Sequence, residues 1–246
     1  MRILAIDTAL PAVSACVLDQ DAEAPIAVES IEMARGHAEA LLPLIQRVMG
    51  KVEGGFASLD RVAVTVGPGS FTGIRIGLAA GQAIALGCKA EIVGVSTLAA
   101  LAAPLILDPF DGVVAAAIDA RHGKVYIAAF DPAGRPLLTP RRAGAHEALR
   151  ALGSGPLLLI GSGAPLLAKE ARIRGVAVKI ASEQAAPDIA FVARLGLAAQ
   201  PETAPARPLY LKEPYVTTPG AEPDAAQDAA VQLDAAGAGV GALAQA

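Results

Sequence analysis

The sequence has few of the residues from which aromatic stacking platforms and cysteine-based sites are built. Its 246 residues include no Trp, and aromatic residues make up only 3% of the chain. A surface that stacks the bases of single-stranded nucleic acid on aromatic rings is therefore not expected. Cys16 and Cys88 are the two cysteines, and each stands in an apolar stretch without a CxxC partner. This spacing argues against a disulfide framework and against a zinc site.

Histidine is also scarce, and its spacing does not suit a metal site. The three histidines are His37, His122 and His146, and no two of them are one helical turn apart. A metal-dependent protein of this size would be expected to pair histidines on one turn of a helix. The chain also lacks a G-x-S-x-G motif, although Ser70 and Ser162 stand in glycine-rich turns. We therefore predict neither a bound metal nor a nucleophilic hydrolase centre.

Acidic side chains without basic ones accumulate near the C-terminus. The net charge is −4, and the residues after Pro219 contribute four acidic side chains and no Lys or Arg. The rest of the chain is balanced, so we do not expect strong nucleic-acid binding by this chain alone. The first apolar run is interrupted at Asp7, and the longest, Leu98–Leu107, contains Pro104 and is too short to cross a bilayer. We expect a cytoplasmic protein without a membrane segment.

The apolar residues are patterned for helices packed on sheets. They make up 54% of the chain and are mostly Ala, Val, Ile and Leu. Short runs bounded by polar or turn residues predict strands, and runs with helical spacing predict helices. The predicted strands are Arg2–Asp7, Val13–Leu18, Pro25–Met33, Arg61–Val66, Ile92–Val95, Val113–Asp119, Val125–Phe130, Leu157–Ile160 and Val176–Ile180. The predicted helices are Gly36–Lys51, Thr72–Leu86, Thr97–Leu107, Ala145–Leu152 and Pro187–Ala199.

The second half of the chain repeats landmarks of the first. Asp7 and Asp119 end equivalent strands, Asp19 and Asp131 stop the next ones, and both pairs are 112 positions apart. The pattern predicts an α/β fold made of a duplicated ribonuclease-H-like unit with two lobes. This is the architecture of the actin/sugar-kinase/chaperone ATPase superfamily. The alternative is a chance similarity between two unrelated α/β halves.

The repeat also predicts where the lobes lie along the chain. Residues 1–107 would form the N-terminal lobe, and residues 108–218 a shortened second lobe. Residues 219–246 are rich in Ala, Gly and acidic side chains, and we expect them to form a low-complexity tail.

Two segments are candidates for contact with a nucleotide. In this superfamily the first hairpin binds phosphate through backbone N–H groups next to a glycine. Here the aspartate and the threonine are present, but the glycine is missing and Pro11 removes a donor. A glycine turn in the second half could lie under an adenine or could simply connect a strand to a helix. The candidate contacts are Asp7, Thr8, Gly161, Ser162 and Gly163.

Two predicted helices are apolar on more than one side. Gly73, Gly77 and Gly81 recur every four residues and share one face of the helix after Ser70. Each glycine costs about 1 kcal/mol relative to Ala in a helix, so this face needs a close approach by another backbone. A phosphate cradle at the helix N-terminus is the other interpretation. The helix Gly36–Lys51 likewise carries two apolar stripes, and only one can face the sheet.

The second stripe either packs inside its own lobe or meets another protein. We predict the latter, with a partner-binding surface on both helices. Its residues would be His37, Leu41, Leu42, Ile45, Val48, Met49, Phe71, Thr72, Gly73, Ile74, Arg75, Gly77, Leu78, Gly81 and Gln82.

Six segments, taken in order, are similar to those of the bacterial TsaB (YeaZ) family. They are Ile3–Thr8, His37–Pro43, Gly67–Gly77, Ser96–Leu98, Asp119–Arg121 and Val125–Tyr126. The string GPGSFTGIRIG within Gly67–Gly77 is the most specific of them. The similarity covers about residues 1–130 and thins to Pro208–Lys212 toward the C-terminus.

This resemblance implies a non-catalytic subunit with the duplicated fold. TsaB-like proteins pair through helices of the N-terminal lobe with a catalytic paralogue, TsaD. TsaD transfers a threonylcarbamoyl group to the adenosine beside the anticodon of tRNA, and the ATPase TsaE joins the complex. In TsaD-like sequences a metal-binding His-x-x-x-His follows the strand that corresponds to Ile92–Val95, whereas this chain has no ligand there.

Further expectations follow from the resemblance. This subunit would require no cofactor, although ATP could bind at an interface of the complex. It would contact tRNA only through the complex, and the isolated chain could form a homodimer. Two alternatives remain, an ATP-dependent enzyme of the actin-like superfamily and a glycoprotease-like peptidase.

Overall fold

Two five-stranded mixed sheets with the same strand order form the centre of the protein. The computed structural model describes residues 1–108 and 110–211. The first sheet has the order β3-β2-β1-β4-β5, and the second, β8-β7-β6-β9-β10, follows the same plan. In each sheet the first three strands in the chain pair antiparallel and the last two run parallel to the first strand. The equal order confirms the predicted duplication of a ribonuclease-H-like unit.

The first unit contains residues from Arg2 to Ile106. Its strands are β1 (Arg2–Asp7), β2 (Ala12–Asp19), β3 (Ala27–Glu32), β4 (Arg61–Gly67) and β5 (Glu91–Ser96). Its helices are α1 (His37–Met49), the short 3-10 helix η1 (Gly55–Ser58), α2 (Phe71–Cys88) and α3 (Thr97–Ile106). Serine side chains begin two of these helices, because Ser70 accepts the Gly73 N–H and Ser96 accepts the Ala99 N–H.

The second unit repeats this order with shorter helices. Its strands are β6 (Val113–Asp119), β7 (Lys124–Phe130), β8 (Pro136–Gly144), β9 (Leu157–Ile160) and β10 (Val178–Ser182). Its helices are α4 (Ala145–Leu152), α5 (Ala164–Arg174) and α6 (Ile189–Ala198). The repeat implied a strand at β8 without giving its bounds. Its two prolines are tolerated because β8 is an edge strand.

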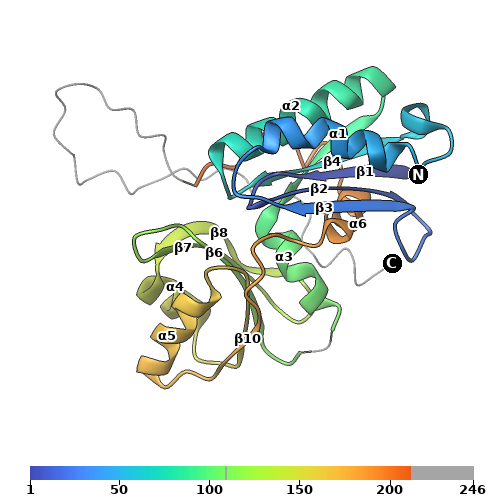
Figure 1. Cartoon of the computed structure of the whole chain (residues 1–246). Helices are drawn as coiled ribbons and strands as arrows, with labels where there is room; N and C mark the ends of the chain where they lie inside the picture. Colours follow the sequence, from blue (N-terminus) through green and yellow to red (C-terminus); the bar gives the residue numbers. More distant parts are fainter. Residues whose placement is uncertain (109, 212–246) are drawn as a thin grey trace, which may run out of the picture.

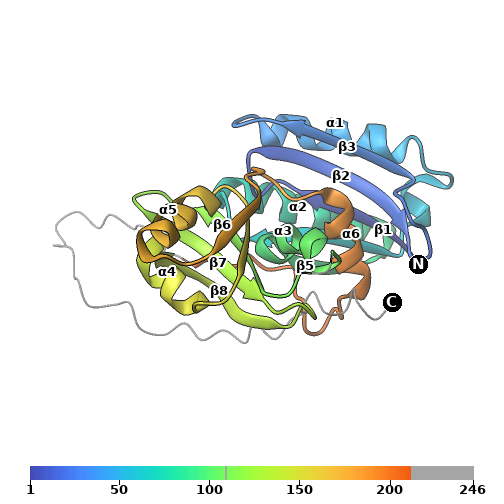
Figure 2. The same cartoon turned by 90° about the horizontal axis from the view of Figure 1, so that it is seen from below.

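The last helix of each unit packs against the sheet of the other unit. Helix α3 contacts β6 and β7, whereas α6 contacts β1, β2 and β4 of the first sheet. Figures 1 and 2 show both helices between the two sheets, with α6 close to β1 and β2. One hydrophobic core therefore runs from the first sheet through α3 and α6 to the near face of the second sheet. A smaller core lies between the far face of the second sheet, α4 and α5.

This crossing places the last described part of the chain on the first lobe. Helix α6 ends the second unit in sequence, but it and the residues after it up to 211 contact the first lobe. The Gly94 N–H donates to the Ala204 carbonyl, and the Leu209 N–H donates to the Val66 carbonyl. The predicted division into residues 1–107 and 108–218 stays a prediction. The predicted tail at 219–246 lies outside the described residues.

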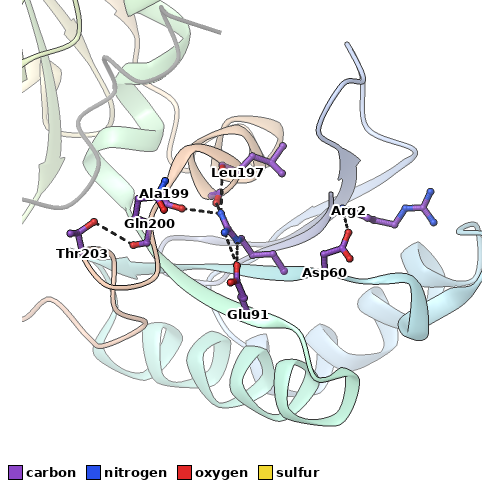
Figure 3. Close-up of polar contacts among 9 residues, drawn as sticks. Arg2, Asp60, Glu91, Leu197, Ala199, Gln200 and Thr203 are labelled. Carbon is purple, nitrogen blue, oxygen red and sulfur yellow. Dashed lines mark hydrogen bonds and ion pairs between the residues drawn. The ribbon is translucent and has the colours of Figure 1, made fainter.

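A buried arginine fastens this returning segment. Arg61, at the start of β4, donates to the carbonyls of Gly196, Leu197 and Ala199 at the end of α6, at 3.0, 3.1 and 2.9 Å. Its guanidinium also lies 2.6 Å from the carboxylate of Glu91 (Figure 3). These contacts satisfy carbonyls that a helix C-terminus leaves without partners. The C-terminal part of the chain is thus held on β4 and β5.

Helix α2 is also notable for its composition. Among the described residues it is the one helix long and apolar enough to match a membrane span, with a mean hydropathy of 1.3. A helix that covers a sheet passes the same test. The buried residues of α2 pack on β4 and include three of its glycines.

Candidate functional site

Helices α1 and α2 form the outer layer of the first lobe. Helix α2 packs on β4 and α1 on β2, while α6 covers the opposite face of the same sheet. Figure 1 shows the two helices side by side on that outer layer, and they contact one another. These are the helices in which the sequence predicts a partner surface.

The glycine face of α2 points into the lobe and not toward a partner. A Cβ atom at Gly73 would overlap the Thr8 carbonyl, and one at Gly81 would overlap the Val64 side chain. At Gly77 a Cβ would lie 2.5 Å from the Thr8 hydroxyl oxygen. The sequence correctly implied that another backbone comes close, but that backbone is the turn after β1. Gly73, Gly77 and Gly81 are therefore not contact residues of an outer surface, which corrects the prediction.

The main apolar stripe of α1 is buried in the same way. Leu41, Ile45, Val48 and Met49 are at most 3% exposed. On α2, Ile74 is 1% exposed and Leu78 is 5% exposed. The predicted partner contacts at Leu41, Ile45, Val48, Met49, Ile74 and Leu78 are thus corrected, because these side chains fill the core between the helices and the sheet. They lie beneath the outer surface and are not exposed on it.

The remaining predicted residues lie on the outward faces of α1 and α2. Leu42 is 55% exposed and Phe71 is 44% exposed, and Thr72, Arg75 and Gln82 are also exposed. Leu86, which the prediction omitted, is 83% exposed at the end of α2. Helical periodicity could have found Leu86, since it lies four residues after Gln82 on the same face. These residues form the outer face of α1 and α2, a name used below for Leu42, Phe71, Thr72, Arg75, Gln82 and Leu86.

An aromatic and cationic cluster stands at the start of α2 on this outer face. The Arg75 guanidinium carbon lies 3.7 Å from the centre of the Phe71 ring, and its Nε donates to the Tyr210 hydroxyl at 3.0 Å. The Phe71 and Tyr210 ring centres are 5.1 Å apart. Sequence reasoning missed Tyr210, because nothing local connects residue 210 with residue 75. The available signal was the short similar segment Pro208–Lys212.

The beginning of α1 is tied to the turn after β1. The Nε2 atom of His37 is 3.0 Å from the Leu10 carbonyl oxygen, and the side chain is half-buried. His37 therefore lies at the edge of the outer face, where it anchors α1. Its predicted partner contact stays a prediction.

The two candidate nucleotide residues of the first hairpin are inaccessible. Asp7 is fully buried, and its Oδ1 accepts hydrogen bonds from the Thr65 hydroxyl at 2.5 Å and from the Ala9 N–H at 3.0 Å. Its Oδ2 has no hydrogen-bond partner among the described residues. Thr8 is 1% exposed and donates its hydroxyl hydrogen to the Gly73 carbonyl. The predicted nucleotide contacts at Asp7 and Thr8 are not supported, because both side chains are buried.

Burial also changes the acidity of Asp7. Desolvation raises the pKa of this carboxyl group, and the hydrogen bonds from Thr65 and Ala9 and the charge of His37 oppose the rise only in part. An isolated buried carboxylate is costly unless it is paired. Asp7 is therefore a structural group that gains from being neutral.

The glycine turn of the second lobe is mostly buried as well. A Cβ at Gly161 would lie 2.5 Å from the Ala117 carbonyl oxygen, and one at Gly163 would lie 3.1 Å from Ala117. Both glycines allow close packing on β6, so the predicted adenine contact at Gly161 and Gly163 is corrected. Ser162 alone is exposed, and its hydroxyl oxygen accepts the Asp119 N–H.

The described residues contain no group of three or more His, Cys, Asp or Glu side chains that could hold a metal ion. Within residues 1–108 and 110–211, the arrangement that stands out is therefore the outer face of α1 and α2, with its exposed apolar side chains and the cluster at Arg75. Trp, Tyr and Arg are the residues most often found at the energetic centre of protein interfaces.

Comparisons with known proteins show which family and which relatives this chain resembles. The family model described as TsaD, tRNA N6-adenosine threonylcarbamoyltransferase, matches residues 30–152, which is half of the chain. The Escherichia coli protein named tRNA threonylcarbamoyladenosine biosynthesis protein TsaB is 37% identical over 130 residues, 53% of this chain and 55% of that protein. The chain thus matches about half the length of this relative. An uncharacterized protein of Mycobacterium tuberculosis is 32% identical over 213 residues, 86% of this chain and 92% of that protein.

The fold also has a solved counterpart. The structure of YeaZ from Pseudomonas aeruginosa superposes with a TM-score of 0.67 at 23% sequence identity. The superposition covers 85% of this chain and 100% of that one. The two chains therefore share the duplicated α/β fold.

Proposed function

Because this chain belongs to the TsaD family and within it resembles the TsaB proteins, we propose that it is a non-catalytic subunit of the complex that adds threonylcarbamoyl to tRNA. Its partner in this proposal is the catalytic paralogue TsaD, and the ATPase TsaE joins the complex. The chain itself requires no cofactor, ATP could bind at an interface of the complex, and the site of action is the cytoplasm. An isolated copy could also pair with a second copy through the same helices.

One observation carries this proposal, the exposed apolar outer face of α1 and α2. Leu42, Phe71 and Leu86 expose large apolar side chains there, beside the exposed polar residues Thr72, Arg75 and Gln82. Burying such side chains contributes about 25 cal/mol per Å² before the costs of association are subtracted. The cluster of Phe71, Arg75 and Tyr210 supplies the aromatic and cationic groups expected at the centre of an interface.

The two alternative functions, an ATP-dependent enzyme and a peptidase, have less support. An ATP-dependent enzyme of the actin-like superfamily would need a phosphate-binding first hairpin, and here the side chains of Asp7 and Thr8 are buried. A glycoprotease-like peptidase would need a nucleophile with an activating base. Ser70 instead uses its hydroxyl oxygen to accept the Gly73 N–H at 3.2 Å. Neither observation favours a reaction centre in this chain.

The proposal is tested by reversing the apolar character of the outer face. We expect Leu42→Glu combined with Leu86→Glu to abolish co-purification with TsaD, because two carboxylates would have to be buried in the interface. Both side chains are exposed, so the variant should keep the circular dichroism spectrum and melting temperature of the wild type.

Ile173→Glu is the matched control for this experiment. Ile173 lies on α5 of the second lobe and is 72% exposed, so the same substitution changes an equally accessible apolar side chain elsewhere. It should leave co-purification intact. Undiminished binding of TsaD by the Leu42/Leu86 variant would overturn the proposed function.

A further inference from the structure

Positive charge is concentrated in the second lobe, although the chain as a whole is weakly acidic. Residues 113–182, from β6 to β10, carry ten Lys and Arg side chains against four Asp and Glu, a net charge of +6. Residues 1–107 carry seven against ten, a net charge of −3. The balanced total thus hides a division between a basic lobe and an acidic lobe.

Part of this charge converges on an open hollow of about 490 Å³. Arg121 and His122 reach it from the turn between β6 and β7, and Lys169 reaches it from α5. All three side chains are exposed. The hydroxyl of Ser162 adds a hydrogen-bond donor at the same place. Arginine, lysine and serine are the side chains that commonly contact the phosphates of nucleic acids.

Two acidic side chains lie near the hollow. Asp119 lines it, and its Oδ1 accepts the backbone N–H of Arg121 at 2.8 Å, so one acidic side chain stands beside the cations. Glu170, next to Lys169 in sequence, is paired with Arg174 and lies 3.1 Å from His146. Within the described part of the chain, no carboxylate lies within ion-pair distance of Arg121 or Lys169. Their charge is therefore available to an external anion.

The turn that carries two of these side chains has a fixed and unusual shape. Arg121 and His122 both have positive φ angles, 64° and 54°, and Gly123 follows at 71°. Residues with a Cβ adopt this region only rarely. The turn is closed by hydrogen bonds from Lys124 N–H to the Arg121 carbonyl and from Ala120 N–H to the Lys124 carbonyl. Arg121 and His122 are thus presented to solvent from a pre-formed loop.

We propose that this basic hollow binds the phosphate backbone of RNA, so that the chain contributes its own contact to the tRNA. The proposal rests on the proposed function, which supplies a tRNA as the polyanion. It refines the expectation that tRNA is reached only through the other subunits. The hollow offers cations and a hydroxyl but no Phe, Tyr or Trp ring, so it binds backbone without reading bases.

The position of the hollow suits this role. It lies on the second lobe, whereas the outer face of α1 and α2 belongs to the first lobe, and Figure 1 shows α5 well separated from both helices. The two surfaces can be occupied at the same time. An RNA bound at the hollow would not compete with a protein bound to α1 and α2.

The test measures binding of an unmodified tRNA transcript to the purified full-length chain by fluorescence anisotropy at several salt concentrations. We expect Arg121→Glu combined with Lys169→Glu to weaken binding at least tenfold. The slope of log K against log salt should fall by about two, because each phosphate contact adds close to one. The matched control is Arg35→Glu combined with Lys51→Glu, which makes the same charge change at exposed positions of the first lobe. It should leave the slope unchanged.

Three results would overturn the proposal. They are an absence of tRNA binding by the wild-type chain at low salt, an equal effect of the two double variants, and an unchanged slope in the Arg121/Lys169 variant. Co-purification with TsaD separates this proposal from the proposed function. The Arg121/Lys169 variant should still bind TsaD, and if it lost TsaD while keeping tRNA, the hollow would belong to a protein interface. Failure of the wild-type chain to bind TsaD would reject the proposed function without deciding the RNA contact.

Discussion

The hydroxyl of Thr8 donates a hydrogen bond to the carbonyl oxygen of Gly73 at 2.7 Å, and both groups are buried. The contact joins the turn after β1 to the first turn of α2, two segments that are 65 residues apart in the chain. It explains why the glycine face of α2 points inward. The helix can approach this turn only where side chains are missing.

Alanine substitutions within α2 should distinguish Gly73, which is needed for packing, from Gly87, which is not. Gly73→Ala is expected to lower the free energy of unfolding by about 1–3 kcal/mol, because its Cβ would overlap the Thr8 carbonyl. Gly87→Ala, in the same helix, meets no atom within 4 Å and should raise it by about 0.5–1 kcal/mol. Urea denaturation of the two variants measures both values. Equal effects of the two substitutions would contradict the assigned packing.

Asp7→Asn should make the protein more stable at neutral pH. Desolvation raises the pKa of Asp7 in the folded state above its unfolded value. The folded state therefore binds the proton more tightly, and stability is lost as the pH rises through the unfolded pKa toward the folded one. Asparagine keeps the acceptor for Thr65 and Ala9 and carries no charge, so the variant should match the wild type only at acidic pH.

Melting temperatures between acidic and neutral pH measure this difference. Asp21→Asn, at an exposed position after β2, is the control and should leave the pH profile of stability unchanged. A lower melting temperature of Asp7→Asn at neutral pH would show that the charge itself is required.

Arg61→Met should release α6 from the first lobe. Arg61 is 5% exposed, and its removal leaves Glu91 and three carbonyls at the end of α6 without their partner. Each buried carbonyl left without a donor costs about 1–3 kcal/mol, whereas the ion pair adds little because the Glu91 side chain is 55% exposed. Arg47→Met, which removes the exposed pair with Glu29, is the control and should have little effect.

Cys16 provides a direct readout of the same release. Burial raises the pKa of its thiol to about 12, and its sulfur lies 3.5 Å from the Ile189 carbonyl at the start of α6. In the wild type Cys16 should therefore react far more slowly with an alkylating reagent than the half-buried Cys88. Arg61→Met should accelerate the labelling of Cys16 and leave that of Cys88 unchanged. Continued protection of Cys16 in this variant would place the anchor of α6 elsewhere.

The cluster at the start of α2 should dominate binding to TsaD. Phe71→Ala removes the ring under the Arg75 guanidinium and should weaken the complex by about 2 kcal/mol, roughly thirtyfold. Tyr210→Phe keeps the ring and loses only the hydrogen bond from Arg75, so its effect should be smaller. Titration calorimetry with purified TsaD measures both affinities. A larger loss for Tyr210→Phe than for Phe71→Ala would contradict the stacking arrangement.

Much of the fold could be predicted because its signals are local. The strand at Arg2–Asp7 has the same bounds in the structure, as does the helix at Ala145–Leu152. The boundaries of α2 differ from the prediction by one residue at the start and two at the end. The repeated aspartates at the ends of β1 and β6 predicted the duplication, since equal spacing of two landmarks reflects equal units.

The candidate site could be predicted only in part. Phe71, Thr72, Arg75, Gln82 and Leu42 were expected on a partner surface and are exposed. The glycines and the main stripe of α1 were expected there as well, but they are buried. Periodicity states which residues share a face of a helix, and it leaves open which neighbour that face meets.

The sequence by itself determined the order of the strands along the chain, the repeat of the two units, and the need for a backbone close to the glycines of α2. The tertiary structure alone decided that this backbone is the turn at Thr8, that α6 crosses to the first sheet, and that Tyr210 stands beside Arg75. It also brought Arg121 and Lys169 to one hollow. The physical reason is that propensity and periodicity act over a few residues, whereas these contacts join segments from 48 to more than 170 residues apart and depend on how whole layers pack.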